Sequence, residues 1–328
     1  MKVLVTGAGG FIGRRVSAAL VARGHSVRAL ARPGARDAPR TEGIERIEAD
    51  LCSTTDLSPV LAGVDAVVHL ATRVRGSDRE IWSESVRGTE RIAAAISLST
   101  VRRVLHASSL SVYDWRRIGD RLDEDSPVGK AADAEADVYA RTKRQQEAIM
   151  RSAARRDDWR LTVLRPGAVW GPGSLALHEI GYTLGPWQVV IASRRHLRIV
   201  YVDECAEAFA TALESDETIG GTFNLVASQG ITAWRYAGAV GRLAGQERPR
   251  VPIPYWPGRL AGGFVYGLCR LFGTAPRVFT GTTIPYRYLA RFHPALCSSD
   301  RLVQLAGWSG RSFDCCLDRC TAELGPRP

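Results

Sequence analysis

A tyrosine and a lysine stand four residues apart in the segment Tyr139-Ala140-Arg141-Thr142-Lys143. Residues at that spacing share one face of an α-helix, so the phenol and the ammonium point the same way. The ammonium favours the ionised phenol electrostatically, and such a phenol can give or take a proton at a carbonyl or hydroxyl oxygen. The spacing therefore predicts general acid–base catalysis, and a plain surface pair on a helix is the alternative.

A serine is expected to complete this pair. The apolar segment Arg102–Ala107 predicts a strand, and Ser108 and Ser109 follow it directly. Ser109 would project at the carboxyl end of that strand, where its hydroxyl can hold the oxygen of a substrate. The alternative is that either serine only caps the strand. The sequence thus predicts Ser109, Tyr139 and Lys143 as catalytic residues.

A glycine-rich loop near the N-terminus predicts a phosphate site. The run Thr6-Gly7-Ala8-Gly9-Gly10-Phe11-Ile12-Gly13 lies between the predicted strand Lys2–Thr6 and the predicted helix Phe11–Arg23. Gly7 permits a tight turn, Gly10 lets the backbone approach a pyrophosphate, and Gly13 lets the helix pack against the strand. Free N–H groups at the helix N-terminus then face the phosphates. A plain glycine-rich turn is the alternative, but the strand–loop–helix context favours a dinucleotide cofactor.

The second predicted strand, Ser26–Ala31, indicates which dinucleotide binds. An NAD site usually ends this strand with an acidic residue that accepts from the ribose 2′-hydroxyl. Here the strand ends Leu30-Ala31, and Arg32 follows. A guanidinium can bind a 2′-phosphate through charge-assisted hydrogen bonds, so NADP is favoured and NAD is less expected. A solvated loop arginine is the alternative reading of Arg32.

Two further residues are expected to contact this cofactor. Asp50 follows the short predicted strand Arg46–Glu48 and is placed to accept from the adenine amino group, with a helix cap as the alternative. Lys143 can hold the nicotinamide ribose as well as support Tyr139.

The elements that must position these residues alternate between strands and helices. Further strands are predicted at Asp65–Leu70 and Leu161–Leu164, and helices at Ile81–Ser97 and Val138–Arg155. Such alternation indicates parallel strands joined by helical crossovers. The predicted fold is α/β, a doubly wound parallel sheet of the Rossmann type, with its ligand site at the carboxyl ends of the strands.

The alternation loosens after Gly171, which suggests a second unit. Residues 172–198 read as irregular, and regular structure resumes with a strand at Ile199–Val202, a helix at Glu204–Leu213 and a strand at Thr222–Leu225. We therefore expect two interleaved units. Residues 1–171 plus 199–228 would form the NADP-binding Rossmann domain, and residues 172–198 plus 229–328 a smaller substrate-binding lid.

The charge of the chain disfavours a nucleic-acid partner. The formal net charge is +10, but only three of the 44 basic residues are lysines. The arginines are scattered along the chain and are not gathered into a stripe with aromatic residues, as nucleic-acid binding would require. A phosphorylated cofactor or an acidic substrate suits the sign of the charge equally well.

The cysteines and the apolar segments indicate a cytoplasmic protein. The seven cysteines are odd in number and form no disulfide framework. Cys315, Cys316 and Cys320 lack a second ligand pair at zinc-site spacing, so free thiols and no metal are expected. The apolar run Leu260–Cys269 is too short to span a bilayer, and no signal peptide is recognisable at the N-terminus.

With these motifs in order, the chain resembles the extended short-chain dehydrogenase/reductases, the NAD-dependent epimerase/dehydratase family. The matching motifs are Thr6–Gly13, Asp50-Leu51, His69-Leu70-Ala71, Ser108-Ser109 with Val112-Tyr113, Tyr139–Lys143, Arg165-Pro166-Gly167 with Gly171-Pro172, Tyr201-Val202-Asp203, Thr222-Phe223-Asn224 and Gly307-Trp308. They run through nearly the whole chain.

The resemblance implies further contacts with the cofactor and a role for His69. The additional cofactor-binding residues that it implies are Thr6, Phe11, Ile12, Leu51, Leu70, Ala71, Thr72, Ser108, Pro166, Gly167 and Val169. His69 would be a packing residue and not a catalytic base. The resemblance also implies a small-molecule substrate and a homodimer.

Departures from the family pattern narrow the expected reaction. Leu110-Ser111 follows Ser109 where sugar-nucleotide dehydratases have an acidic pair. The run Leu197-Arg198-Ile199-Val200 lacks the diphosphate-clamping Arg-Asp-Phe pattern, from which Arg198 is one position displaced. We predict an NADP-dependent enzyme that reduces a ketone or oxidises a secondary alcohol on a small-to-medium organic substrate. The alternative is a nucleotide-sugar epimerase with recycled NAD(P). A cofactor-sensing regulator is disfavoured, because Tyr139 and Lys143 are both retained.

Overall fold

The computed structural model describes residues 1–34, 42–175, 180–227, 230–272 and 284–325. Its centre is a seven-stranded sheet in the order β12-β7-β5-β4-β1-β2-β3, in which every neighbouring pair is parallel. These strands are β1 (Lys2–Thr6), β2 (Ser26–Ala31), β3 (Ile44–Glu48), β4 (Ala66–His69), β5 (Arg103–Ala107), β7 (Arg160–Pro166) and β12 (Thr222–Leu225). The strand order reverses between β1 and β4, which is where a doubly wound sheet binds its ligand.

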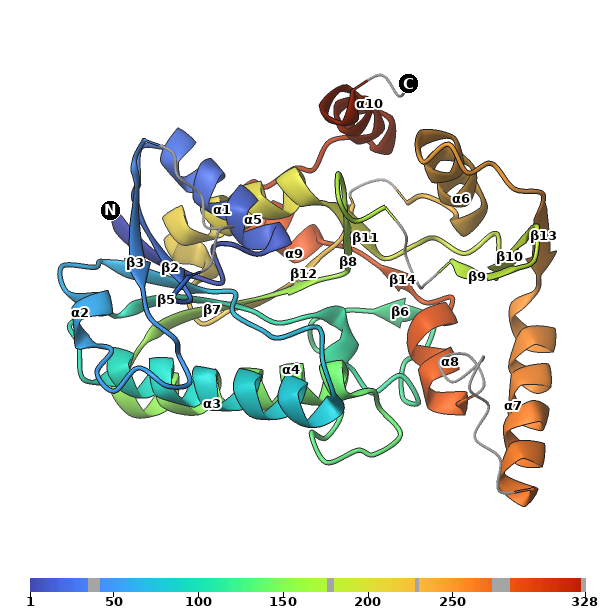
Figure 1. Cartoon of the computed structure of the whole chain (residues 1–328), viewed down its shortest axis with the longest axis horizontal. Coiled ribbons are helices and arrows are strands. Elements are labelled where there is room, and N and C mark those ends of the chain that lie inside the picture. Colours follow the sequence, from blue (N-terminus) through green and yellow to red (C-terminus); the bar gives the residue numbers. More distant parts are fainter. Residues whose placement is uncertain (35–41, 176–179, 228–229, 273–283, 326–328) are drawn as a thin grey trace.

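Helices cover both faces of this sheet (Figure 1). One face carries α1 (Phe11–Ala22) and α5 (Val202–Glu214), and the other carries α3 (Asp78–Ser97) and α4 (Val138–Asp157). Alternate residues of each strand enter opposite cores: Val3 and Val5 pack with α1 and α5, while Leu4 packs with α3 and α4. Burial on both faces explains why the strands read as nearly continuous apolar runs. The predicted doubly wound Rossmann sheet is confirmed.

A smaller sheet lies beside the main one and corrects the sequence prediction for residues 172–198. There β9 (Gly181–Leu184) pairs antiparallel with β10 (Trp187–Ile191), and β13 (Arg250–Ile253) pairs parallel with β10. The expectation of an irregular segment was wrong for these residues; residues 176–179 lie outside the described part. Gly185, with φ of +55°, supplies the turn between the strands, and the β-branched run Val189-Val190-Ile191 is buried.

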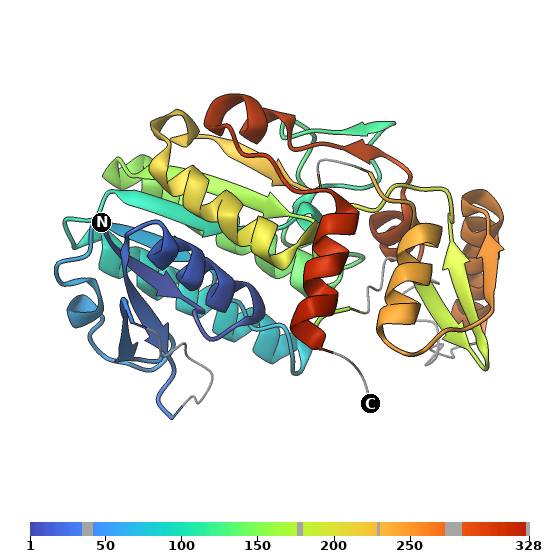
Figure 2. The ribbon, with the colours of Figure 1, turned by 90° about the horizontal axis from the view of Figure 1, so that it is seen from above.

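The helices α6 (Ala233–Leu243), α7 (Tyr255–Leu271) and α8 (Pro285–Phe292) gather around this smaller sheet at one end of the molecule (Figure 2). The chain then returns to β12 of the main sheet through α9 (Asp300–Ala306), and α10 (Phe313–Leu324) packs with α6 and forms ion pairs with α1 and α5. The remaining short elements are α2 (Ser58–Leu61), η1 (Leu110–Val112), β6 (Arg121–Leu122), β8 (Ala168–Trp170), β11 (Ile199–Tyr201), η2 (Asp216–Thr218) and β14 (Leu296–Cys297). Within the described ranges, no helix has the length and apolar character needed to cross a membrane.

Candidate active site and cofactor pocket

The helix α4 carries the predicted tyrosine and lysine. Asp137 fixes its start, because the Asp137 side chain accepts a hydrogen bond from the backbone N–H of Ala140 at 2.8 Å. Tyr139 follows in the first turn and is half-buried, and Lys143 lies one turn further on and is buried. The Lys143 ammonium nitrogen is 6.0 Å from the centre of the Tyr139 ring. The two side chains therefore share a face of the helix, as their spacing predicts.

The Lys143 ammonium joins three separate parts of the fold. Its Nζ donates to Thr72 Oγ1, in the segment after β4, and to the carbonyl of Ala107, at the end of β5, both at 2.7 Å. Burial lowers the pKa of Lys143 to about 7, while the nearby negative charge of Glu147 opposes that shift. The lysine thus lies at the carboxyl edge of the sheet, where the negative charge of Glu147 only partly offsets the cost of burying its ammonium.

Ser109 is close to this lysine along the chain. Lys143 binds the carbonyl of Ala107, and Ser109 is two residues further along the chain. Ser109 caps the start of η1, where its Oγ accepts from the backbone N–H of Ser111 at 3.2 Å. The capping role weighed in the sequence analysis is therefore present. A hydroxyl that accepts one hydrogen bond still has its own proton to donate, so this cap leaves Ser109 able to hold a substrate oxygen.

A buried ion pair behind these residues was not predicted from the sequence. Glu147 lies one turn after Lys143 on α4, and its carboxylate accepts from both the Nε and Nη2 of Arg165 at 3.2 and 2.6 Å. Ser108 Oγ also donates to it at 2.5 Å. Burial raises the pKa of the Glu147 carboxyl, but Arg165 outweighs this and holds the pKa below its usual value. Ser108, predicted to contact the cofactor, thus directs its hydroxyl to Glu147.

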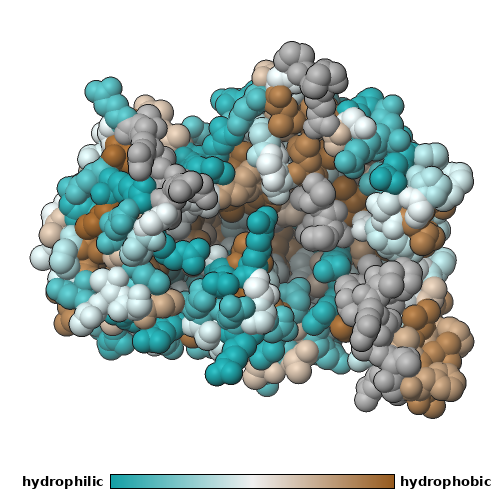
Figure 3. Space-filling model, viewed as in Figure 1, coloured by the Kyte–Doolittle hydropathy of each residue, from teal (hydrophilic) through white to brown (hydrophobic). Residues whose placement is uncertain are grey.

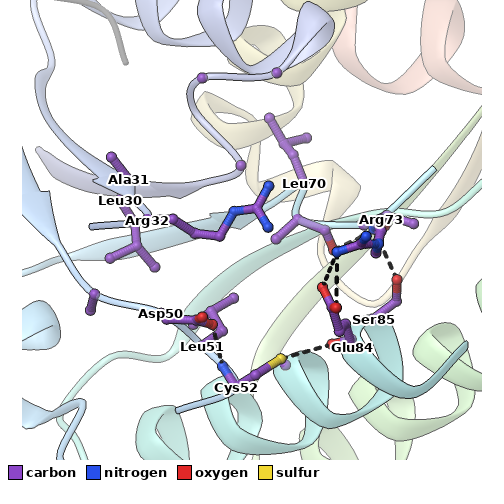
Figure 4. Close-up of a pocket in the computed structure, with 17 residues that line it drawn as sticks. Leu30, Ala31, Arg32, Asp50, Leu51, Cys52, Leu70, Arg73, Glu84 and Ser85 are labelled. Atoms are coloured by element: carbon purple, nitrogen blue, oxygen red, sulfur yellow. Dashed lines mark hydrogen bonds and ion pairs between the residues drawn. The ribbon is translucent and has the colours of Figure 1, made fainter. Parts of the chain in front are cut away.

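A cavity of about 350 Å³ opens at the carboxyl ends of β1 to β4 (Figure 4). Eight of the predicted cofactor residues line it: Gly7, Gly10, Arg32, Asp50, Leu51, Leu70, Ala71 and Thr72. A Cβ on Gly7, whose φ is +72°, would lie 3.0 Å from the backbone of Ala71, and one on Gly13 would lie 2.1 Å from the carbonyl oxygen of Gly7. These contacts give the physical reason for glycine at both positions. At the start of α1, Gly10 provides no side-chain cap, which suits a phosphate.

The other predicted cofactor residues do not line this cavity. They are Thr6, Phe11, Ile12, Gly13, Ser108, Tyr139, Lys143, Pro166, Gly167 and Val169. Thr6 is buried beneath it, where its Oγ1 accepts from the backbone N–H of Ala71 at 3.3 Å and pairs with His69 Nδ1 at 2.8 Å. His69 is buried and also hydrogen-bonds Thr89, an environment that fits the predicted packing role. Burial lowers the pKa of His69 to about 3.

Arg32 and Asp50 are two of the charged residues that line the cavity. The exposed Arg32 follows Ala31 at the end of β2 and extends across the cavity toward Leu70 (Figure 4). Asp50 Oδ1 accepts from the backbone N–H of Cys52 at 2.8 Å, so it stabilises a turn while lining the cavity.

An ion pair that was not predicted from the sequence stands on the opposite wall. Arg73 Nη1 donates to both carboxylate oxygens of Glu84 at 2.9 and 2.8 Å. Ser85, next to Glu84 on α3, accepts from the backbone N–H of Arg73 at 2.9 Å. The position of Arg73 directly after Leu70-Ala71-Thr72 was the available sequence signal. Across the described residues, no cluster of three or more His, Cys, Asp or Glu side chains is arranged to hold a metal ion.

Comparison with known proteins identifies the family. The model of the NAD-dependent epimerase/dehydratase family matches residues 3–225, which include the glycine loop, the Tyr139–Lys143 pair and, apart from Lys2, all seven strands of the main sheet. The chain belongs to this family. The match confirms the resemblance drawn from the motifs.

Sequence relatives and a solved structure agree with that membership. The chain is 34% identical over 179 residues to a 4-hydroxy-2-methyl-3-oxo-4-farnesyl-3,4-dihydroquinoline-1-oxide ketoreductase of Stigmatella aurantiaca, covering 54% of this chain and 52% of that protein. It is 27% identical over 266 residues to a human decarboxylating sterol-4-alpha-carboxylate 3-dehydrogenase, covering 78% and 70%. The crystal structure of gox2253 superposes with a TM-score of 0.79 at 26% identity, covering 98% of this chain and 96% of that one.

The family and the names of its relatives define the class of protein. The chain is a short-chain dehydrogenase/reductase of the extended, NAD(P)-dependent type. The matched stretch spans about half the length of the ketoreductase, 52%.

Proposed function

We propose that this protein is an NADP-dependent oxidoreductase that reduces a ketone to a secondary alcohol, or catalyses the reverse oxidation, with Tyr139, Lys143 and Ser109 as its catalytic residues. The observation that carries the proposal is the placement of Lys143 Nζ, bonded to Ala107 at the end of β5 and 6.0 Å from the Tyr139 ring. On the family resemblance we also propose a homodimer, and on the free cysteines a cytoplasmic location.

The three side chains would divide the proton transfer among them. The nicotinamide, when bound, supplies or accepts the hydride. Tyr139 would donate its phenolic proton to the oxygen of the carbonyl being reduced, as a general acid. Lys143 would stabilise the negative charge left on the phenol and hold the nicotinamide ribose, while Ser109 would donate a hydrogen bond that fixes the substrate oxygen.

The proposed substrate is a small-to-medium molecule with an apolar body. The support comes from two relatives, one named for a farnesyl-bearing oxo compound and the other for a sterol carboxylate. Both names describe an oxygen-bearing carbon on a hydrocarbon-rich framework. We infer that the substrate of this chain presents its ketone or hydroxyl in a similar setting.

The surroundings of Arg198 support a reductase over the nucleotide-sugar epimerase. Arg198 is the residue nearest to the expected diphosphate clamp, but its guanidinium donates to the carbonyls of His293 at 2.6 Å and Ala290 at 3.1 Å. It also lies 4.4 Å from the centre of the Trp115 ring. These contacts hold the end of α8, and the N–H groups that make them point to the protein backbone and not to a diphosphate.

Cofactor preference gives a first test. Arg32→Ala is expected to weaken NADP(H) binding roughly tenfold or more while leaving NAD(H) affinity nearly unchanged, because only the 2′-phosphate would pair with the guanidinium. Calorimetry with both cofactors measures this. Arg155→Ala, which removes an exposed arginine from the end of α4, is the control and should leave both affinities unchanged. A wild-type preference for NAD(H), or equal loss of both cofactors in Arg32→Ala, would refute the assignment of Arg32.

Cofactor turnover separates a reductase from an epimerase. A reductase oxidises one reduced nicotinamide for each alcohol formed, whereas an epimerase returns its cofactor unchanged. With ketones carried on a hydrocarbon framework as candidate substrates, the absorbance of NADPH is expected to fall in proportion to product. If the protein instead inverts a nucleotide sugar without added nicotinamide, the epimerase alternative is correct.

A further inference from the structure

The helix α7 presents large apolar side chains to solvent. Brown side chains gather on the end of the molecule that α7 forms, at the lower right of Figure 3. Its most exposed large side chains, with Phe272 directly after it, are Trp256 (62% exposed), Leu260 (72%), Phe264 (68%), Leu271 (80%) and Phe272 (75%). Contiguous exposed apolar surface of this kind marks a site of interaction.

The apolar residues occupy one half of the helix. Trp256, Leu260, Phe264 and Leu268 follow each other at intervals of four residues, so they form a stripe along one side. Ala261, Val265 and Leu271 are exposed beside this stripe. Every exposed residue of α7 whose side chain the structure describes is apolar, glycine or proline. We call this half of the helix the outer face.

The opposite half of α7 is held by the protein. Tyr288 of α8 donates its hydroxyl proton to the carbonyl of Tyr255 at 2.9 Å, and the two rings lie 5.6 Å apart. A Cβ on Gly258 would lie 2.4 Å from the Tyr288 hydroxyl, so the helix approaches α8 closely there. Since α8 covers the inner face, the outer face is what α7 offers to a partner.

We propose that the outer face of α7 binds the surface of an anionic lipid bilayer, with the helix lying in the plane of the interface. The apolar stripe would enter the boundary between headgroups and acyl chains, where tryptophan is favoured. Arg259 lies on the half-buried side, 5.1 Å from the Trp256 ring, and its long side chain can reach headgroup phosphates.

The charge of the surrounding sequence selects an anionic partner. Between Glu247 and Asp300 the chain has seven arginines and neither aspartate nor glutamate. A second copy of this chain on the same face would bring the like charges of the two stretches together, whereas anionic lipid supplies the opposite charge. The helix also stands at the far end of the molecule, away from the main sheet, in both views of the ribbon (Figures 1 and 2).

Vesicle co-sedimentation of the full chain tests the proposal. The protein is expected to pellet with vesicles of phosphatidylcholine mixed with phosphatidylglycerol, to bind phosphatidylcholine alone much more weakly, and to be released by salt. Leu260→Glu, which inserts a negative charge in the stripe, should reduce binding roughly tenfold or more. Leu98→Glu is the matched control, because Leu98 is 91% exposed at the end of α3, and it should bind like the wild type.

Measurement of the molar mass by light scattering tests whether the variants change the oligomeric state. Leu260→Glu should keep the mass and the cofactor affinity of the wild type, since the side chain is exposed and lies outside the cofactor cavity. Phe264→Glu repeats the test at a second position of the stripe. The proposal is wrong if the wild type binds neither vesicle type, or if both variants bind vesicles as well as the wild type does. It is also wrong if the variants dissociate an oligomer without changing lipid binding, because the outer face would then bind a second copy of the chain.

Discussion

Tyr139→Phe is expected to lower kcat for ketone reduction about 10²- to 10⁴-fold and to leave NADP(H) affinity largely intact, because the substitution removes a general acid and no phosphate contact. Fluorescence titration of the cofactor and single-turnover kinetics measure the two quantities separately. The half-buried ring of Tyr139 remains in the variant, so packing around α4 changes little.

Two variants sharpen this test. Lys143→Ala should impair both turnover and cofactor binding, because its ammonium would hold the ribose as well as support Tyr139. Tyr266→Phe removes a phenol from α7 and should turn over like the wild type. Near-normal activity in Tyr139→Phe would show that another group supplies the proton.

The fold could be predicted because its signals are local. Most strands of the main sheet are short apolar runs, and each connecting helix carries its own period, so the alternation can be recognised without knowledge of distant contacts. The glycine loop is local at Gly13, which meets the backbone of Gly7 and Ala8 in the same loop, whereas Gly7 meets the backbone of Ala71 after β4. The β9–β10 hairpin was not predicted because its strands have only 4 and 5 residues, and runs this short carry little periodic signal.

The buried ion pair behind the catalytic residues depends on the register of the sheet and could not be predicted in the same way. Ala107 of β5 lies opposite Leu164 of β7, so the residues that follow them, Ser108 and Arg165, emerge side by side. Glu147 then reaches both from α4, which packs across these strands. Three residues separated by up to 57 positions thus meet through pairing that no single stretch of sequence encodes.

The residues of the cofactor cavity also differ in how well the sequence predicts them. Arg32 and Asp50 were identifiable because each follows a strand that ends at the cavity. Glu84 lies within a helix, and its contact with Arg73 requires α3 to pack beneath the segment after β4. At this cavity, the two residues that follow strand ends could therefore be predicted from the sequence, and Glu84, which is placed by helix packing, could not.

Loss of one partner from the buried ion pair between Glu147 and Arg165 is expected to lower the free energy of unfolding strongly. Their side chains are only 6% and 4% exposed. Glu147→Gln would leave the Arg165 charge buried without its counter-charge, and loss of one partner from such a pair costs about 3–5 kcal/mol. We expect the free energy of unfolding, measured by urea denaturation at neutral pH, to fall by that amount. Glu207→Gln is the matched control, because the Glu207–Arg23 pair is exposed and contributes about 0–1 kcal/mol.

The pH dependence and a double variant identify the cause of that loss. Because the pKa of Glu147 is lowered in the folded state, its contribution is present above the unfolded pKa and disappears as the pH falls through the folded one. The stability difference between wild type and Glu147→Gln should therefore shrink toward acid. Glu147→Gln combined with Arg165→Met removes both buried charges and should be more stable than Glu147→Gln alone. Arg151, which also pairs with Glu147, is 30% exposed and can be solvated. Simple addition of the two single losses would instead mean that packing, and not charge, accounts for the effect.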